Sequence, residues 1–329
     1  MEEAQRGFVK HAIRDGSDWD ISTVPNGYFY GPLDLAIGTD DAPRISYHDH
    51  QDPSVFRPEK GDAIFAVLRD GAWQVDAIAH QGHDGWDNRI TVDAQDGTHR
   101  RAIDPVDFGG RGVEYYGQQA DGSWVVEQVS SNPISYKYAT SIVVDPQGRP
   151  HITYFNEPRG ELILASRGAS GWTEQVIEER DAGLFSSLLI DDAGRFHVSY
   201  LQRTSNNAGT VKYATKDATD SDWEIREIDW LTALSFGTVG ARNSTSLVVD
   251  VQGNPWVAYT DERDLTLAVW DGSDFQTSTV VSSGNRNLSQ LVSMKLNHIG
   301  QPHLTYVEVT NTRPLQGNVK YAVGTPQRS

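Results

Sequence analysis

The hydrophobic pattern of this chain repeats at a long period. One phrase combines a short apolar run, an Asp-x-x-Gly turn and an alternating run that ends in tyrosine. It reads SIVVDPQGRPHITY at 141–154, SLLIDDAGRFHVSY at 187–200, SLVVDVQGNPWVAY at 246–259 and SMKLNHIGQPHLTY at 293–306. Degenerate copies begin at Asp34 and Arg89, so the starts are separated by 55, 52, 46, 59 and 47 residues. Such self-similarity is typical of repeat architectures.

Each copy continues with two more strand-like runs. The third is LILA (162–165), VKYA (211–214) or LTLAV (265–269), and the fourth opens on an aromatic residue, as in WTEQVI (172–177) and FQTSTV (275–280). Four short strands in about 50 residues, with no sustained helical period, predict a β-propeller blade. Six copies predict an all-β, six-bladed β-propeller forming one domain over residues 1–329. The blades are expected at about 28–79, 80–129, 130–177, 178–228, 229–280 and 281–324.

The sixth copy lacks its fourth strand. GFVKHAI (7–13) matches GWTEQVI (171–177), so we expect the N-terminal strand to complete the last blade and protect its edge. We also expect the first strands to be buried on both faces, the Asp-x-x-Gly phrases to form turns, and the fourth-strand aromatic residues to anchor the blades. The phrase resembles a widespread group of bacterial repeat propellers, and that resemblance implies a fold without implying a function.

Composition excludes several classes of function. The chain contains no cysteine, which removes disulfides and thiol chemistry. A net charge of −17 makes a nucleic-acid partner unfavourable. The sequence has no apolar run long enough to span a membrane, and the segment MEEAQRG does not resemble a signal peptide. We expect a monomer, extracellular or periplasmic if a signal was removed and otherwise cytoplasmic.

Eight of the ten histidines fall into two kinds, and the other two, His11 and His298, are expected on the surface of a strand and of a turn. His99, His151, His197 and His303 occupy one slot of the repeat, where Arg44 and Trp256 stand in the other two copies. We interpret these four as structural, bonding local backbone, although histidines at one radius could also surround a metal. His48, His50, His80 and His83 are in no repeated slot. Loops after second strands and before first strands share one face of a propeller, so these four are expected to converge between blades 1 and 2.

Blades 1 and 2 also replace the serine that opens the other first strands, with Asp34 and Arg89. Irregularity on a regular scaffold is where a site is expected. The alternative is that the histidines are solvated and that Asp34 pairs with Arg89.

Four imidazoles would suit a divalent metal ion such as Zn, Cu, Fe or Ni, which could activate water for hydrolysis, and Ca is also a candidate ion for this site. The metal-ligand candidates are His48, His50, His80 and His83. The second interpretation, given next, uses protein side chains alone and needs no cofactor.

HDGWDNRITVDAQDGTH (83–99) resembles a segment of propeller polysaccharide lyases of the ulvan-lyase kind, which pair histidine and tyrosine for proton transfer at a uronate. The resemblance implies that His83 is the acid or base, that Arg89 neutralises the carboxylate and that Tyr138 is the partner, with His48 and His50 beside them. Trp86 could stack on a sugar. Arg89, Arg242 and Arg286 could form a sialidase-like triad, but the S-x-D-x-G-x-T-W box is missing.

The leading hypothesis is therefore a carbohydrate-active, lyase-like enzyme for an acidic, uronate-containing glycan. Asp34, Trp86, Arg242, Asn243 and Arg286 are its predicted substrate-binding residues. A metal-dependent enzyme is the second hypothesis, and a non-catalytic propeller that binds a glycan or a protein is the third.

Overall fold

The computed structural model describes most of the chain. The described residues are 8–16, 18–28, 33–50, 61–79, 86–104, 112–132, 140–232, 234, 245–261, 263–282, 288–312 and 315–324. The chain divides into two compact units. Unit 1 is Met1–Tyr136 with Val144–Pro150 and Arg167–Trp172, and unit 2 is Lys137–Val143, His151–Ser166 and Thr173–Ser329.

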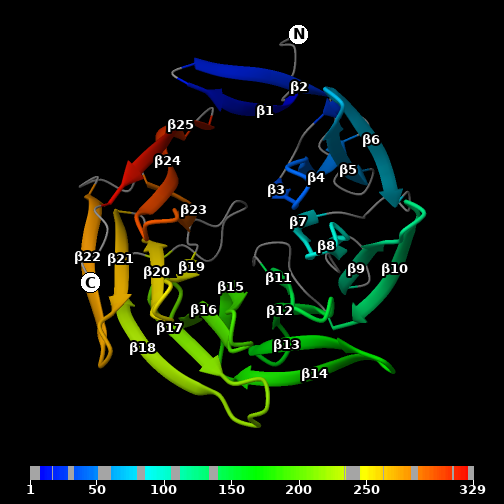
Figure 1. Ribbon diagram of the computed structural model, residues 1–329. Helices are drawn as coiled ribbons and strands as arrows, with labels where there is room; N and C mark the ends of the chain where they lie inside the picture. The colour runs from blue at the N-terminus through cyan, green and yellow to red at the C-terminus, as the bar shows by residue number, and fades with distance from the viewer. Residues whose placement is uncertain are drawn as a thin grey trace. The chain divides into compact units, whose positions relative to one another are not determined.

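Unit 1 contains a hairpin and two four-stranded antiparallel sheets (Figure 1). The hairpin is β1 (Phe8–Asp15) and β2 (Asp18–Tyr28). Blade 1 is β3 (Asp34–Ile37), β4 (Pro43–His50), β5 (Gly61–Arg69) and β6 (Ala72–Ala79), and blade 2 is β7 (Trp86–Val92), β8 (Thr98–Asp104), β9 (Gly112–Gln118) and β10 (Trp124–Ser130).

Unit 2 contains most of blade 3 and all of blades 4 to 6. Blade 3 is β11 (Ser141–Val144), β12 (Pro150–Asn156), β13 (Glu161–Gly168) and β14 (Gly171–Glu178). Blade 4 is β15 (Ala182–Ile190), β16 (Phe196–Arg203), β17 (Gly209–Lys216) and β18 (Glu224–Leu231). Blade 5 is β19 (Thr245–Val249), β20 (Pro255–Thr260), β21 (Asp264–Trp270) and β22 (Phe275–Ser282), and blade 6 is β23 (Leu288–Leu296), β24 (Pro302–Thr312) and β25 (Leu315–Val323).

These sheets follow the six repeats of the sequence, and the described residues contain strands and no helix. The predicted all-β, six-bladed β-propeller is therefore confirmed. None of the described segments is a helix of the length and apolarity that crossing a membrane requires.

The turns follow the predicted chemistry. In blade 3 the Asp145 carboxylate accepts hydrogen bonds from the backbone amides of Gln147 and Arg149, at 3.0 and 2.9 Å, and Gly148 has a φ of 76°. That φ is accessible to glycine at no steric cost. The fourth-strand aromatic residues do pack between elements: Trp172 meets Tyr115 with ring centroids 5.4 Å apart.

One expectation needs correction. Burial of the first strands on both faces holds only in part: β19 is mostly buried, whereas β3 is not. In β3 the side chains alternate, and Leu35 and Ile37 are 47% and 59% exposed.

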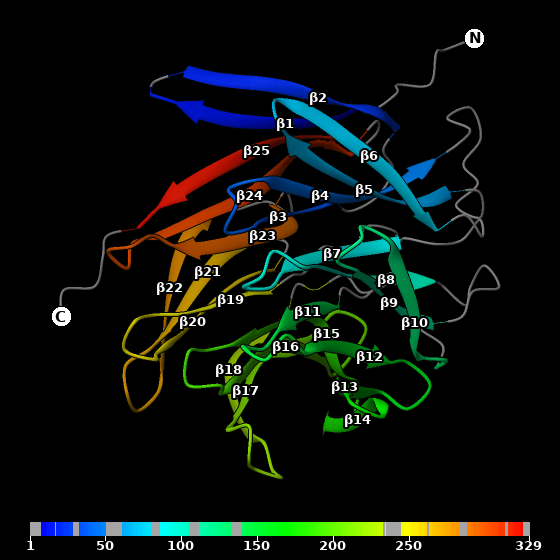
Figure 2. The same cartoon turned by 45° about the vertical axis from the view of Figure 1, so that its right-hand side comes forward.

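The N-terminal strand also differs from its expected pairing. A turn at Gly16 folds β1 back on β2, with register pairs from Phe8–Tyr28 to Asp15–Asp18, while the last sheet contains three strands. The hairpin lies beside β6 of blade 1 in both views (Figures 1 and 2). Completion of blade 6 by residues 7–13 stays a prediction, as does the single domain.

Candidate functional site

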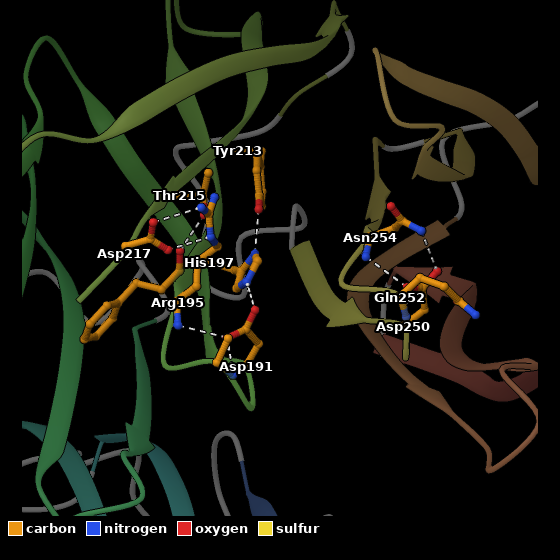
Figure 3. A network of polar contacts seen from close by, with 11 residues as sticks. Asp191, Arg195, His197, Tyr213, Thr215, Asp217, Asp250, Gln252 and Asn254 are labelled. Carbon is orange, nitrogen blue, oxygen red and sulfur yellow. Dashed lines mark hydrogen bonds and ion pairs between the residues drawn. The ribbon is translucent and has the colours of Figure 1, made fainter. Parts of the chain in front are cut away.

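The periodic histidines have structural partners. In blade 4, His197 lies between Tyr213 and Asp191, with Nδ1 2.5 Å from the tyrosine hydroxyl and Nε2 3.1 Å from Asp191 Oδ2 (Figure 3). Burial lowers the pKa of His197 and raises that of Tyr213 to about 12, so both are neutral at pH 7. A carboxylate only accepts, so Nε2–H donates to Asp191 and the tyrosine hydroxyl donates to Nδ1.

The full arrangement recurs at His99, and the same slot makes related side-chain contacts in the other blades. His99 lies 2.6 Å from the Tyr115 hydroxyl and 2.9 Å from Asp93 Oδ2. His151 is bonded to Ser166, and His303 to Tyr321 and Asn297. Trp256 donates to Asp250, and Arg44 makes two 2.8 Å bonds to Asp40. The structural interpretation is thus confirmed, but the partners are turn and third-strand side chains and not backbone.

The serine slot of the first strands connects neighbouring blades. Ser187 Oγ accepts from the backbone amide of Leu247, and Ser246 Oγ accepts from that of Met294, at 3.3 and 3.0 Å. Asp34 does the same in blade 1, because its Oδ2 accepts from the Ile90 amide at 3.0 Å. Asp34 is therefore a structural equivalent of the serine in this contact, and its role in substrate binding stays a prediction.

Arg89 cannot take this role. A guanidinium has five donors and no acceptor, so it cannot receive an amide N–H from the next first strand. Arg89 is half-buried on β7, and its Nη1 donates to the backbone oxygen of Asn88 at 3.1 Å. Of the two charged residues in the slot, only Arg89 departs from the chemistry of the repeat.

A larger departure lies in the second and third strands of blade 2. In the other five blades an aliphatic residue of the second strand is paired in register with an alanine of the third: Ile45–Ala66, Ile152–Ala165, Val198–Ala214, Val257–Ala268 and Leu304–Ala322. Blade 2 has Arg100 opposite Tyr116 at this place, and both side chains are fully buried. The Arg100 guanidinium carbon lies 5.0 Å from the Tyr116 ring centroid, a cation–π contact.

The next register pair is also altered. Ala102 opposes Glu114 where the other blades carry a tyrosine in the second strand. Glu114 is 6% exposed, and the Tyr116 hydroxyl donates to its Oε2 at 2.6 Å. Blade 2 thus buries a cation, a phenol and a carboxylate on one face. Burying charge is costly unless it is paired, so this face is atypical for a propeller core.

Blade 1 supplies polar residues to the same space. Arg100 Nε donates to Ser46 Oγ, and Ser46 Oγ donates to Asn88 Oδ1 at 3.2 Å. His48 follows Ser46 by two residues on β4, so it lies on the same face of that strand. It is 1% exposed and stands in the slot that holds Ile103, Phe155, Leu201, Thr260 or Val307 in the other blades. We call Ser46, His48, Asn88, Arg100, Glu114 and Tyr116 the blade 1–2 polar cluster.

Many predicted site residues lie outside the described residues. These are His80, His83, Tyr138, Arg242, Asn243 and Arg286. For His50 and Trp86 the backbone alone is described, at the end of β4 and the start of β7. The C-terminal half of β4 contacts β7, so the end of β4 and the start of β7 lie at one end of blades 1 and 2. Convergence of the four imidazoles at that end stays a prediction.

A metal site is not apparent in the described part of the chain, where no group of three or more His, Asp or Glu side chains converges. The proposed ligands His80 and His83 lie outside those residues, so the metal hypothesis is untested.

Sequence reasoning missed Arg100, Glu114 and Tyr116. The signal was present in the repeat: an arginine stands in a slot that is otherwise aliphatic, and a tyrosine in one that is otherwise alanine.

Comparison with known proteins shows similarity in fold alone. No protein-family model and no curated protein sequence matches the chain. An α-L-arabinofuranosidase from Fusarium graminearum is similar over 89% of this chain and 92% of its own, with a TM-score of 0.59 and 11% identity. A lectin from Aleuria aurantia is similar over 89% and 94%, with a TM-score of 0.55 and 11% identity.

A Hadza microbial sialidase is similar over 85% of this chain and 63% of the sialidase chain, with a TM-score of 0.50 and 12% identity. At these identities the comparisons support the propeller, and they leave the lyase resemblance a prediction. The chain is therefore similar in fold to β-propellers that include a lectin and glycosidases, and it is assigned to no family.

Proposed function

We propose that the protein is a carbohydrate-active enzyme for an acidic, uronate-containing glycan, with its site at the end of blades 1 and 2 where β4 ends and β7 begins. The blade 1–2 polar cluster is the observation that carries this proposal. Five blades fill the equivalent position with an aliphatic–alanine pair, and blade 2 alone fills it with Arg100 and Tyr116. A chain that retains such an arrangement against its repeat has a use for it.

Arg89 is the residue best suited to the substrate carboxylate. It is half-buried on β7, and it stands where four other blades place a serine. Abstraction of a proton beside a carboxylate builds negative charge, which a nearby cation stabilises. His48, or the predicted His83, would transfer the proton, with Tyr138 as the predicted partner.

Arg100 would act as a positioning residue. Three hydrogen bonds connect it to Arg89: Arg100 to Ser46, Ser46 to Asn88 Oδ1, and Arg89 to the Asn88 backbone oxygen. This series fixes β7 against β4 and so holds Arg89 in place relative to His48. Precise placement of this kind is what catalytic groups need.

The three similar propellers bear names of glycan-binding or glycan-cleaving proteins, which favours a glycan over other ligands for this chain. A metal-dependent enzyme with His48, His50, His80 and His83 as ligands is the second candidate. Its distinguishing property is a stoichiometric metal ion.

The test compares wild-type protein with variants that restore the repeat. His48→Leu introduces the residue of the equivalent position 201, and Arg89→Ser introduces that of positions 141, 187 and 246. The readout is absorbance at about 235 nm on uronate polymers, where an unsaturated product of proton abstraction absorbs. We expect activity in the wild type and a loss of at least about 100-fold in each variant, in the range of general acid–base contributions. The control variant His197→Gln changes a periodic histidine and should lose no activity.

Elemental analysis of tag-free protein completes the experiment. Stoichiometric metal that is lost in His48→Leu would contradict the lyase proposal and support the metal-dependent enzyme. Absence of any new absorbance across a panel of uronate polymers would also contradict it.

A further inference from the structure

Unit 1 contains a groove between the hairpin β1–β2 and blade 1, away from the blade 1–2 polar cluster. It has a volume of about 570 Å³ and is lined by His11 and Ser22 of the hairpin, by Trp73 of β6 and by the turns at 40–43 and 68–71. Small-molecule sites have volumes of about 300–1,000 Å³. All the lining residues belong to the described part of unit 1.

The groove exists because an interblade contact is missing. In blade 2 the fourth-strand residue Glu127 makes a bidentate ion pair with Arg167, and it also accepts from the Trp172 indole at 2.9 Å. The equivalent contact of blade 3 is Gln175 with Lys216, at 2.7 Å.

Blade 4 again fills this place, with Arg226 stacked over Trp270 at 4.6 Å. The hairpin presents His11 at the equivalent position, and blade 1 presents Leu68 in place of the cation. A histidine opposite a leucine leaves open the space that a pair of long side chains fills after blades 2, 3 and 4.

His11 is the unusual feature of this groove. It is only 9% exposed, and its ring packs edge-on against Trp73, with centroids 5.5 Å apart. Among the described residues it has no hydrogen-bond partner. The ring nitrogens of His11 are not among the fully buried atoms left without a partner, so they are accessible from the groove and can bond a ligand that enters it.

The Trp73 ring, which lies beside His11 in the groove, is held in place by a hydrogen bond. The Trp73 indole donates to Ser22 Oγ at 3.1 Å, which holds the ring in place between hairpin and blade. A rigid aromatic ring with neighbouring hydrogen-bonding groups is a suitable surface for a hydroxylated ring such as a sugar.

The rim is acidic. Asp20, Asp41 and Asp70 line the groove and are exposed, against one exposed cation, Arg69. Asp40 also lines it, but the Arg44 guanidinium holds its pKa at about 2 and balances its charge. The remaining carboxylates favour a positive charge on the ligand and disfavour an anion.

We propose that this groove binds a hydroxylated, positively charged ligand of monosaccharide size, of the chemical class of a hexosamine unit with a free amino group. The aromatic ring of Trp73 contacts the sugar ring, the imidazole of His11 bonds a ligand hydroxyl or ammonium, and the rim carboxylates neutralise the amine. This site is separate from the proposed uronate site. The groove borders the start of β4 at Pro43 and the polar cluster its far half at His48, which are about 17 Å apart along an extended strand.

The experiment is calorimetric titration of the full chain with three probes of different charge: a glucosamine trisaccharide, its N-acetylated form and glucuronate. We expect the glucosamine probe to bind, the N-acetylated probe to bind at least 10-fold more weakly and glucuronate not to bind. His11→Leu should weaken binding of the glucosamine probe at least 10-fold. The paired change Asp41→Asn with Asp70→Asn should do the same without straining the backbone, because both residues have positive φ, 56° and 51°, which asparagine tolerates.

Trp223→Phe, the equivalent aromatic position of blade 4, is the matched control and should leave binding unchanged. The inference is overturned if the glucosamine probe does not bind, if the three probes bind equally, or if the Asp41, Asp70 double variant binds like wild type. If His11→Leu disrupts the packing of the hairpin, the double variant at Asp41 and Asp70 still tests the proposal. His48→Leu should not affect this titration, so failure here is distinguishable from failure of the uronate proposal.

Discussion

The polar face of blade 2 allows a sharp test by restoring the repeat. The single change Arg100→Ile introduces the residue of blade 3, Ile152, and leaves the rest of the cluster in place. The combined variant adds Glu114→Ile and Tyr116→Ala, which copy Ile163 and Ala165, and Ala102→Phe, which supplies the missing ring. Phenylalanine is used because the tyrosine hydroxyls of blades 3 and 4 bind Glu174 and Glu178, and blade 2 has Val126 where blade 3 has Glu174.

The two variants should differ strongly in stability. Arg100→Ile leaves the Glu114 carboxylate, 6% exposed, without the cation that lies over the tyrosine bonded to it. Removing one partner from a buried charged arrangement costs about 3–5 kcal/mol. Replacing the whole arrangement by apolar residues of similar volume is often neutral or stabilising, by about 1–4 kcal/mol. We therefore expect the combined variant to lie within about 1 kcal/mol of wild type or above it.

Urea unfolding followed by circular dichroism measures the stability of both variants. The chain has two compact units, so the curves are fitted without assuming a single transition, and the transition shifted by Arg100→Ile is compared across variants. A single variant as stable as wild type would show that Arg100 and Glu114 are not coupled. A combined variant less stable than the single one would show that the cluster is required for packing, and would refute its assignment to function.

Three further predictions concern the regular parts of the fold. Asp34→Ser should leave the unfolding free energy within about 0.5 kcal/mol of wild type because serine keeps the acceptor for the Ile90 amide, whereas Asp34→Ala should cost about 1–3 kcal/mol; equal loss in both would contradict the equivalence. Burial lowers the pKa of His197 below its value of about 6.5 in the unfolded chain. The contribution of His197 to stability is therefore full above about pH 6.5 and is lost as the pH falls from there through the lower pKa of the folded state. A His197→Gln variant whose unfolding free energy depends on pH as steeply as that of wild type would contradict this prediction. Arg167→Ala should cost no more than about 1 kcal/mol in urea unfolding, because 44% of its side chain is exposed and its pair with Glu127 is screened; a loss of several kcal/mol would mean that this contact holds the blades together.

The fold could be predicted from sequence because its signal is repeated six times. Each copy places an apolar run, a turn aspartate and a turn glycine at the same spacing, so errors in one copy are corrected by the others. The structural role of the periodic histidines followed from the same redundancy, although the partners of His197 are the side chains of Asp191 in the turn and Tyr213 on the third strand, and not the local backbone that was expected.

The candidate site was predictable only in its location. Irregular residues indicated blades 1 and 2, and the polar cluster lies there. His48 was predicted, but Arg100 and Tyr116 were missed because they are ordinary residues in strand-like runs, and the contact of Arg100 with Ser46 comes from another blade. The contact that Asp34 makes was not predictable either, because a carboxylate replaces the serine acceptor without changing the contact.

The central claim, that blades 1 and 2 depart from the repeat in order to hold an acidic glycan, is tested most directly by titrating a uronate tetrasaccharide into wild-type protein and the Arg89→Ser, His48→Leu double variant. We predict saturable, salt-dependent binding in the wild type, and at least a 10-fold loss in the variant at unchanged thermal stability. Equal binding by the two proteins, or no binding by either, would contradict the claim.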